Sequence, residues 1–214
     1  MKPSMAKVTT RVRKLAQIAD ELRSGANFPV TRMTTVKGLC EDPEAAARFA
    51  LHLAGLTRDK MAHRCCPDHI EPAKWSYYRA LATSAVRQME SYLEGRTGET
   101  AASLRALLSE IEEAQSQHKY LEWGPVRTIE SEDLLLVENA LRCVLSSAPA
   151  YWGYRVAKEY TERYEPRYGT GLIPASAPMV EEIAKFWCQY HFGMPLSEWL
   201  AASSEAYPRY SSAK

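Results

Sequence analysis

The strongest structural signal in the chain is an apolar stripe in residues 72–93. Apolar side chains recur there at steps of three and four, so they lie on one face of a helix. Pro72 suits the first helical turn, where its missing N–H costs nothing, and Gly95 is well placed to end the helix in a left-handed turn. The pattern predicts a core helix with neighbours on two sides. Its inward residues are Trp75, Tyr78, Leu81, Ala82, Ala85, Val86, Met89, Tyr92 and Leu93.

Helical periodicity continues along most of the chain, and no strand-like alternation persists over about five residues. The sequence therefore predicts an all-α protein, a single globular multi-helix domain of about seven or eight helices in orthogonal or bundle-like packing. This single domain is expected over residues 1–208, with a frayed tail at 209–214. Long helices are expected near residues 6–24, 43–61, 72–93, 100–118, 131–147, 149–164 and from 176, with short helical segments near 34–40 and 195–206.

Composition indicates a soluble chain that can build a sizeable core, with 46% apolar and 25% charged residues. No run approaches the roughly 18 apolar residues of a membrane span, and the N-terminus lacks the apolar region of a secretory signal. The five cysteines are an odd number, which fits reduced thiols better than a disulfide framework. We therefore expect a cytoplasmic protein without a membrane partner.

The charge is balanced overall but unevenly distributed. The net charge is +1, yet residues 1–40 hold eight Lys or Arg against two acids, whereas residues 99–140 hold nine acids against three Lys or Arg. Such asymmetry can steer a partner or pair two subunits, although two solvated surfaces of one domain are the simpler explanation. A homodimer and nucleic-acid binding through the basic N-terminal region stay as alternatives, nucleic acid being the less expected partner.

A tyrosine-rich helix near residues 149–164 and the loop that follows it form the best candidate site. Tyrosine offers an apolar body with a polar tip, and arginine pairs with carboxylates, phosphates or aromatic faces. This mixture suits a protein partner or an anionic or aromatic small ligand, and it also suits a helix buried on two sides. The candidate binding residues are Tyr151, Tyr154, Arg155, Tyr160, Arg163, Arg167, Tyr168, Gly169 and Gly171. If they bind a ligand, Arg155, Arg163 and Arg167 should be partly exposed beside tyrosine rings rather than held in ion pairs.

A second candidate is a cluster of cysteines and histidines between two predicted helices. Its spacing misses the usual zinc patterns, because adjacent cysteines rarely bind one ion together. A Cys and a His three residues apart on a later helix could complete a site if the fold brought them near. A metal-dependent protein is therefore the alternative function, with His63, Cys65, Cys66, His69, Cys188 and His191 as the ligand candidates.

No recognisable catalytic motif is present. The chain lacks the Glu-x-x-His pairs of di-iron bundles, a G-x-S-x-G elbow and a phosphate-binding loop. The sequence does not decide whether the protein is an enzyme, but the absence of a catalytic motif favours a non-catalytic protein. No cofactor is expected. The favoured interpretation is a non-catalytic α-helical binding or protein-interaction protein whose partner the sequence does not identify.

Overall fold

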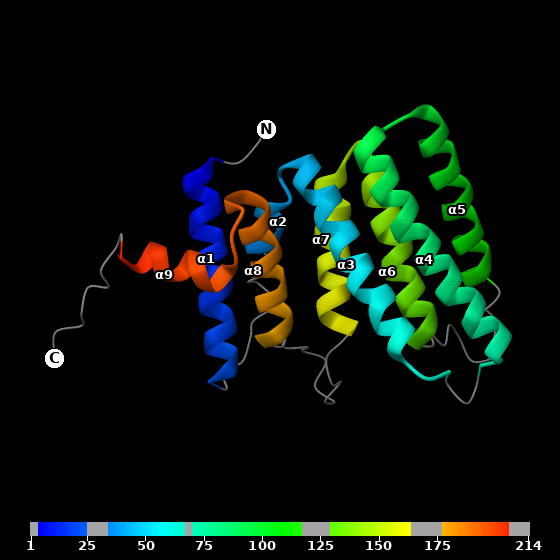
Figure 1. Ribbon diagram of the computed structural model, residues 1–214, viewed down its shortest axis with the longest axis horizontal. Helices are drawn as coiled ribbons and strands as arrows, with labels where there is room; N and C mark the ends of the chain where they lie inside the picture. The colour runs from blue at the N-terminus through cyan, green and yellow to red at the C-terminus, as the bar shows by residue number, and fades with distance from the viewer. Residues whose placement is uncertain (1–3, 25–33, 67–69, 117–128, 164–176, 206–214) are drawn as a thin grey trace. The chain divides into compact units, whose positions relative to one another are not determined.

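The computed structural model describes residues 4–24, 34–66, 70–116, 129–163 and 177–205 (Figure 1). Within these ranges the protein has nine helices and no strand, and 88% of the residues are helical, which confirms the all-α prediction. Among the described helices, none combines the length and hydropathy that a membrane span requires. The helices are α1 (Met5–Arg23), α2 (Thr34–Leu39), α3 (Pro43–His63), α4 (Pro72–Gly95), α5 (Gly98–Ser116), α6 (Ile129–Leu145), α7 (Pro149–Arg163), α8 (Ala177–Phe192) and α9 (Leu196–Glu205).

The chain divides into two compact units. Residues 1–39 and 165–214 form the first, and residues 40–164 form the second. The single domain predicted over residues 1–208 stays a prediction, and the tail at 209–214 lies outside the described residues.

In the first unit, α1 packs along α8, while α2 contacts α1 and α9 contacts α8. The apolar stripe of α1, with Val12 and Leu15 at its centre, is buried, as is Trp187 of α8. Phe192 at the end of α8 stacks on Trp199 of α9, with ring centroids 4.8 Å apart. Aromatic stacking of this kind adds to the burial of apolar area and joins the short last helix to its neighbour.

In the second unit, α6 is the central helix and contacts α3, α4, α5 and α7. Helix α4 packs against α3, α5 and α6. Trp75, Leu81 and Met89 are buried, which confirms that the predicted stripe faces a core, whereas Tyr92 is only half-buried. Burial of these side chains stabilises the fold, because each fully buried large apolar side chain contributes about 1.5–3 kcal/mol to the free energy of unfolding.

Two helix ends differ from the sequence prediction. The left-handed residue after α4 is Arg96, with φ 45°, and its N–H donates to the carbonyl of Tyr92 at 2.7 Å. Gly95 is the last helical residue instead, so the prediction placed the left-handed turn one position too early. Helix α6 begins at Ile129, two residues before the start expected at residue 131.

Two buried polar residues of α6 are paired with residues from other elements. Asp133 of α6 is fully buried and accepts a hydrogen bond from the guanidinium of Arg64 at 3.1 Å. Asn139, six residues further along α6, donates to Glu159 of α7 at 2.6 Å. A buried carboxylate or amide is costly without such partners, so these contacts fix how α6 meets its neighbours.

Candidate functional site

The predicted tyrosine site is partly core. Tyr160 of α7 is 3% exposed, and the ammonium of Lys60 on α3 donates to its hydroxyl at 3.1 Å. The same ammonium lies 4.7 Å from the centroid of the Tyr160 ring, so Tyr160 contributes to the packing of α7 on α3. Tyr154 is half-buried, whereas Tyr151 is 59% exposed. Of the described tyrosines in this set, Tyr151 alone presents a largely open ring to solvent.

Arg155, the predicted anion ligand of this helix, is held by a carboxylate. Its Nε donates to Glu159 at 3.0 Å, and this hydrogen bond is the main reason that the pKa of Arg155 is raised. Its guanidinium also lies over the ring of Trp152 at 5.4 Å. The prediction of an arginine outside ion pairs is therefore wrong for Arg155. The side chain of Arg163, and the remaining candidates Arg167, Tyr168, Gly169 and Gly171, lie outside the described residues.

The structure does not assemble a metal site from the cysteine and histidine candidates that it describes. His63 and Cys65 are exposed at the end of α3, and the thiol of Cys66 donates to the carbonyl of Ile70 at 3.4 Å. His69 lies outside the described residues. Nowhere in the described ranges do three or more His, Cys, Asp or Glu residues lie where they could hold an ion.

The late pair of metal candidates belongs to the other unit and serves packing there. Cys188 of α8 is buried, which raises the pKa of its thiol to about 11. The ring of His191 stacks on Trp187, with centroids 5.6 Å apart and planes 15° from parallel. A protonated thiol is a poor metal ligand, because metals bind the thiolate.

Two of the three arginines of the basic N-terminal helix bond to backbone carbonyls within their own unit. Arg11 of α1 donates to the carbonyl of Gly38, and Arg13 donates to the carbonyl of Ser203 at 3.2 Å. Arg13 also lies 5.7 Å from the ring centroid of Trp199. Lys7 and Lys14 remain exposed on α1, which leaves a smaller cationic surface than the sequence indicates.

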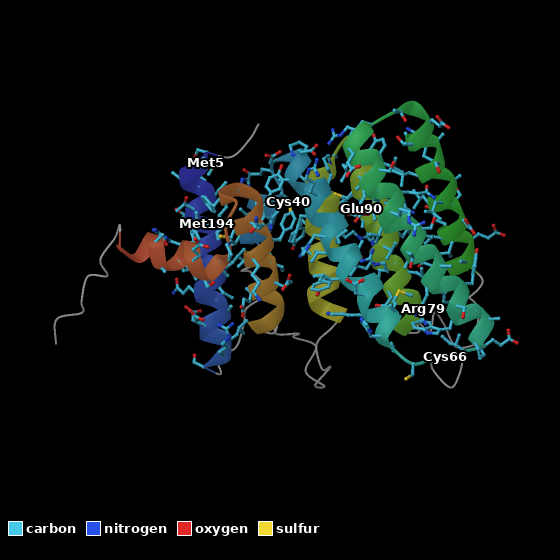
Figure 2. All side chains as sticks on the ribbon, viewed as in Figure 1. Met5, Cys40, Cys66, Arg79, Glu90 and Met194 are labelled. Carbon is cyan, nitrogen blue, oxygen red and sulfur yellow. The ribbon has the colours of Figure 1, made fainter. Side chains whose placement is uncertain are left out.

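A different cationic surface lies on α3 and α4, which the sequence did not identify as a site. These two helices run in opposite directions beside each other (Figure 1) and line an open groove of about 450 Å³. Figure 2 marks the position of Arg79, one of the α4 residues of this surface. We call it the arginine groove, and its lining residues are Arg58 and Ala62 of α3 and Ser76, Arg79, Ala80, Thr83, Ser84 and Arg87 of α4.

Helical spacing explains why these side chains share one surface. Ser76, Arg79, Thr83 and Arg87 recur at steps of three and four, which places them on one face of α4. The buried stripe of the same helix occupies the other face, so burial of the stripe turns the arginines outward. Thr83 is exposed, and its hydroxyl donates back to the carbonyl of Arg79 at 2.8 Å.

The charge of the arginine groove is not balanced locally. Within the described ranges, neither Arg79 nor Arg87 takes part in an ion pair, and no acidic side chain lines the groove. Arg58 pairs with its chain neighbour Asp59 at 2.8 Å, a contact with substantial exposure on both sides. None of the three guanidinium groups is buried, and two of them have no ion pair in the described ranges. They can therefore donate to anionic groups at little desolvation cost.

The sequence contained part of this signal. Arg79, Thr83 and Arg87 are recognisable as the polar face of a helix, a pattern that usually indicates a solvated surface. The sequence alone could not show that Arg58 and Ala62 of α3 lie beside this face of α4, because the contact depends on how the two helices pack. The chain matches no protein family, no curated protein and no solved structure.

Proposed function

We propose that this protein is a non-catalytic helical binding protein that recruits an anionic partner into the arginine groove. The observation that carries the proposal is a groove lined by Arg58, Arg79 and Arg87, in which two of the three have no ion pair within the described ranges. Most other described arginines in the second unit, such as Arg142 and Arg155, are engaged by carboxylates.

Arginine suits this role because its guanidinium presents several N–H donors in one plane and pairs bidentately with carboxylate or phosphate. Exposed pairs of this kind contribute about 0.2–1 kcal/mol each, so a few of them give modest affinity and strong dependence on salt. The hydroxyl of Ser84 accepts from Gln88 at 3.1 Å, which leaves its own proton available to an anion in the groove. The groove therefore favours a reversible contact.

The arginine groove replaces the tyrosine helix as the favoured surface, because Tyr160 is buried and Arg155 is paired. Nothing in the described residues favours the metal alternative. Binding through the basic N-terminal region keeps the exposed lysines Lys7, Lys14 and Lys37 as its support among the described residues. A cytoplasmic location also belongs to the proposal, since all five cysteines are free. A homodimer stays a prediction.

The proposal is tested by retention on immobilised heparin, used as a generic polyanion, with a salt gradient. The wild-type protein is expected to bind at low salt and to elute as salt rises, because screening weakens exposed charge pairs. The double variant Arg79→Glu/Arg87→Glu should elute clearly earlier.

Arg105→Glu is the control, because Arg105 is exposed on α5 and lies outside the arginine groove. It should elute much closer to wild type than the double variant does. A Lys7→Glu/Lys14→Glu variant tests the N-terminal alternative in the same column. If the groove double variant elutes with Arg105→Glu while the lysine variant loses retention, the N-terminal surface binds the anion and the proposal is wrong.

A further inference from the structure

We infer that the occupant of the arginine groove is an acidic helix of a partner protein, whose carboxylates meet Arg79 and Arg87 along one face. This inference rests on the proposed function and adds to it the chemical class and the shape of the partner. It depends on the length of the groove, on the helices that line it and on the kinds of side chain that it contains.

The polar and cationic side chains are spread along the groove rather than gathered at one point. Ser76 and Arg87 lie three turns apart on α4, which corresponds to ~16 Å at the rise of an α-helix. Arg79 and Arg87 are separated by two turns, or ~12 Å. An approaching helix places its own residues i and i+7 or i+8 at about the same separation and near one face. Two acidic residues with that spacing can therefore meet both arginines at once.

The walls of the groove also suit a helix. A groove between two antiparallel helices can receive the ridge of side chains of a third helix. Ala62 of α3 and Ala80 of α4 are exposed lining residues, and their small side chains leave room for that ridge. The long arginine side chains can lie beside the ridge and reach carboxylates on either side of it.

Other anions fit less well. Single-stranded nucleic acid is usually bound by aromatic stacking, and base edges are read by side chains such as Asn and Gln, yet none of these residue types lines the arginine groove. The net charge of +1 and pI of about 7.6 are also low for a nucleic-acid-binding protein. A single phosphate would use one arginine of an open groove and leave the other, two turns away, without a ligand.

The test is a binding titration by fluorescence anisotropy with labelled, alanine-rich helical peptides about 18 residues long. One peptide carries its glutamates along one face, and a matched peptide carries the same number scattered around the helix. The one-face peptide should bind wild-type protein and the Arg105→Gln control equally well. It should bind Arg79→Gln/Arg87→Gln about tenfold more weakly, as expected for the loss of two exposed charge pairs.

The scattered peptide should bind wild type several-fold more weakly than the one-face peptide. Inorganic phosphate should displace the one-face peptide no better than chloride at the same ionic strength. Equal binding of the two peptides, specific displacement by phosphate, or tighter arginine-dependent binding of a thymidine oligonucleotide would overturn the acidic-helix inference. These results would leave the proposed function standing if heparin retention still required Arg79 and Arg87. Loss of that requirement would instead defeat the proposed function itself.

Discussion

Arginine side chains in the second unit occupy two distinct environments. Arg142 of α6 contacts Glu112 at 2.5 Å and Glu138 at 2.7 Å, and its guanidinium lies 5.5 Å from the ring centroid of Trp152. Arg79 and Arg87 have no such carboxylate in the described ranges. The first environment links helices, because a guanidinium fixed by two acids and a ring holds several elements together. The second environment leaves the guanidinium charge accessible, which is why we propose that an anionic partner binds there.

Thiol accessibility separates the five cysteines into a buried and an accessible group. Cys40, Cys143 and Cys188 are buried, and burial raises the pKa of Cys143 to about 12 and that of Cys188 to about 11. Their thiols therefore stay protonated near neutral pH, and the reactive thiolate is scarce. Cys65 is exposed and Cys66 is partly exposed. Figure 2 marks Cys66 near the end of α3.

We predict that N-ethylmaleimide at neutral pH labels Cys65 first and Cys66 next in the native protein, with the other three modified only after unfolding. Intact mass followed by peptide mapping measures this order. A Cys65→Ser/Cys66→Ser variant is the control and should resist labelling until denaturant is added. Rapid native labelling of Cys40 or Cys143 would show that the assigned burial is wrong.

At the scale of the helices, each unit depends on one buried apolar face. Leu81 of α4 is 4% exposed in the second unit, and Ile183 of α8 is 1% exposed in the first. An aspartate at either position would place a charge among apolar side chains without a partner.

We predict that Leu81→Asp and Ile183→Asp each lower the free energy of unfolding by ~4 kcal/mol or more, which is severe for a single substitution. Ser91→Asp on α4 and Gln189→Asp on α8 are the matched controls, because both positions are exposed. Each control should change stability by ~0.5 kcal/mol or less. Urea titration followed by circular dichroism measures the free energy of unfolding of all four variants. A value near wild type for either core variant would refute the burial of that residue.

Two glycines in helices should respond in opposite ways to a larger side chain. Gly55 of α3 has open space where a Cβ would lie, whereas a Cβ on Gly153 of α7 would lie 3.1 Å from the Cβ of Ala46 and 3.3 Å from the thiol of Cys40. Gly153 therefore allows the close approach of α7 to α3, and Gly55 only lowers helix propensity.

We predict that Gly55→Ala raises the free energy of unfolding by ~0.5–1 kcal/mol, because alanine restricts the unfolded chain and favours the helix. Gly153→Val should lower it by ~1–3 kcal/mol through overpacking. Chemical denaturation of both variants under one set of conditions checks the signs. A stabilising Gly153→Val would contradict the close packing of α3 and α7.

For the molecule as a whole, the sequence predicted the class of fold well but did not single out the arginine groove. Helices follow from local periodicity, so the stripe from Trp75 to Leu93 could be assigned without tertiary information. The arginine groove depends on which helices become neighbours and on which arginines find carboxylates. Glu159 is an obvious i+4 partner for Arg155, but the second contact of Glu159 with Asn139 arises only from the packing of α6 on α7.

The division into two units further limits what composition could reveal. All eight basic residues of 1–40 belong to the first unit, where Arg11 and Arg13 bond to backbone carbonyls. The arginine groove belongs to the second unit. It lies within residues 41–98, which hold eight Lys or Arg and eight acids. A count of charges along the chain therefore pointed to α1, whereas the cations of Arg79 and Arg87 lie elsewhere.

Mapping of the anion contact by NMR tests the arginine groove most directly. A short heparin oligosaccharide is added to ¹⁵N-labelled protein at low salt, and amide shifts are followed through the titration. We predict that the largest shifts fall on residues 58–62 of α3 and 76–87 of α4, and that Arg79→Gln/Arg87→Gln removes them. Shifts confined to α1 around Lys7 and Lys14, or to α7 around Tyr151, would contradict the assignment of the arginine groove as the binding surface.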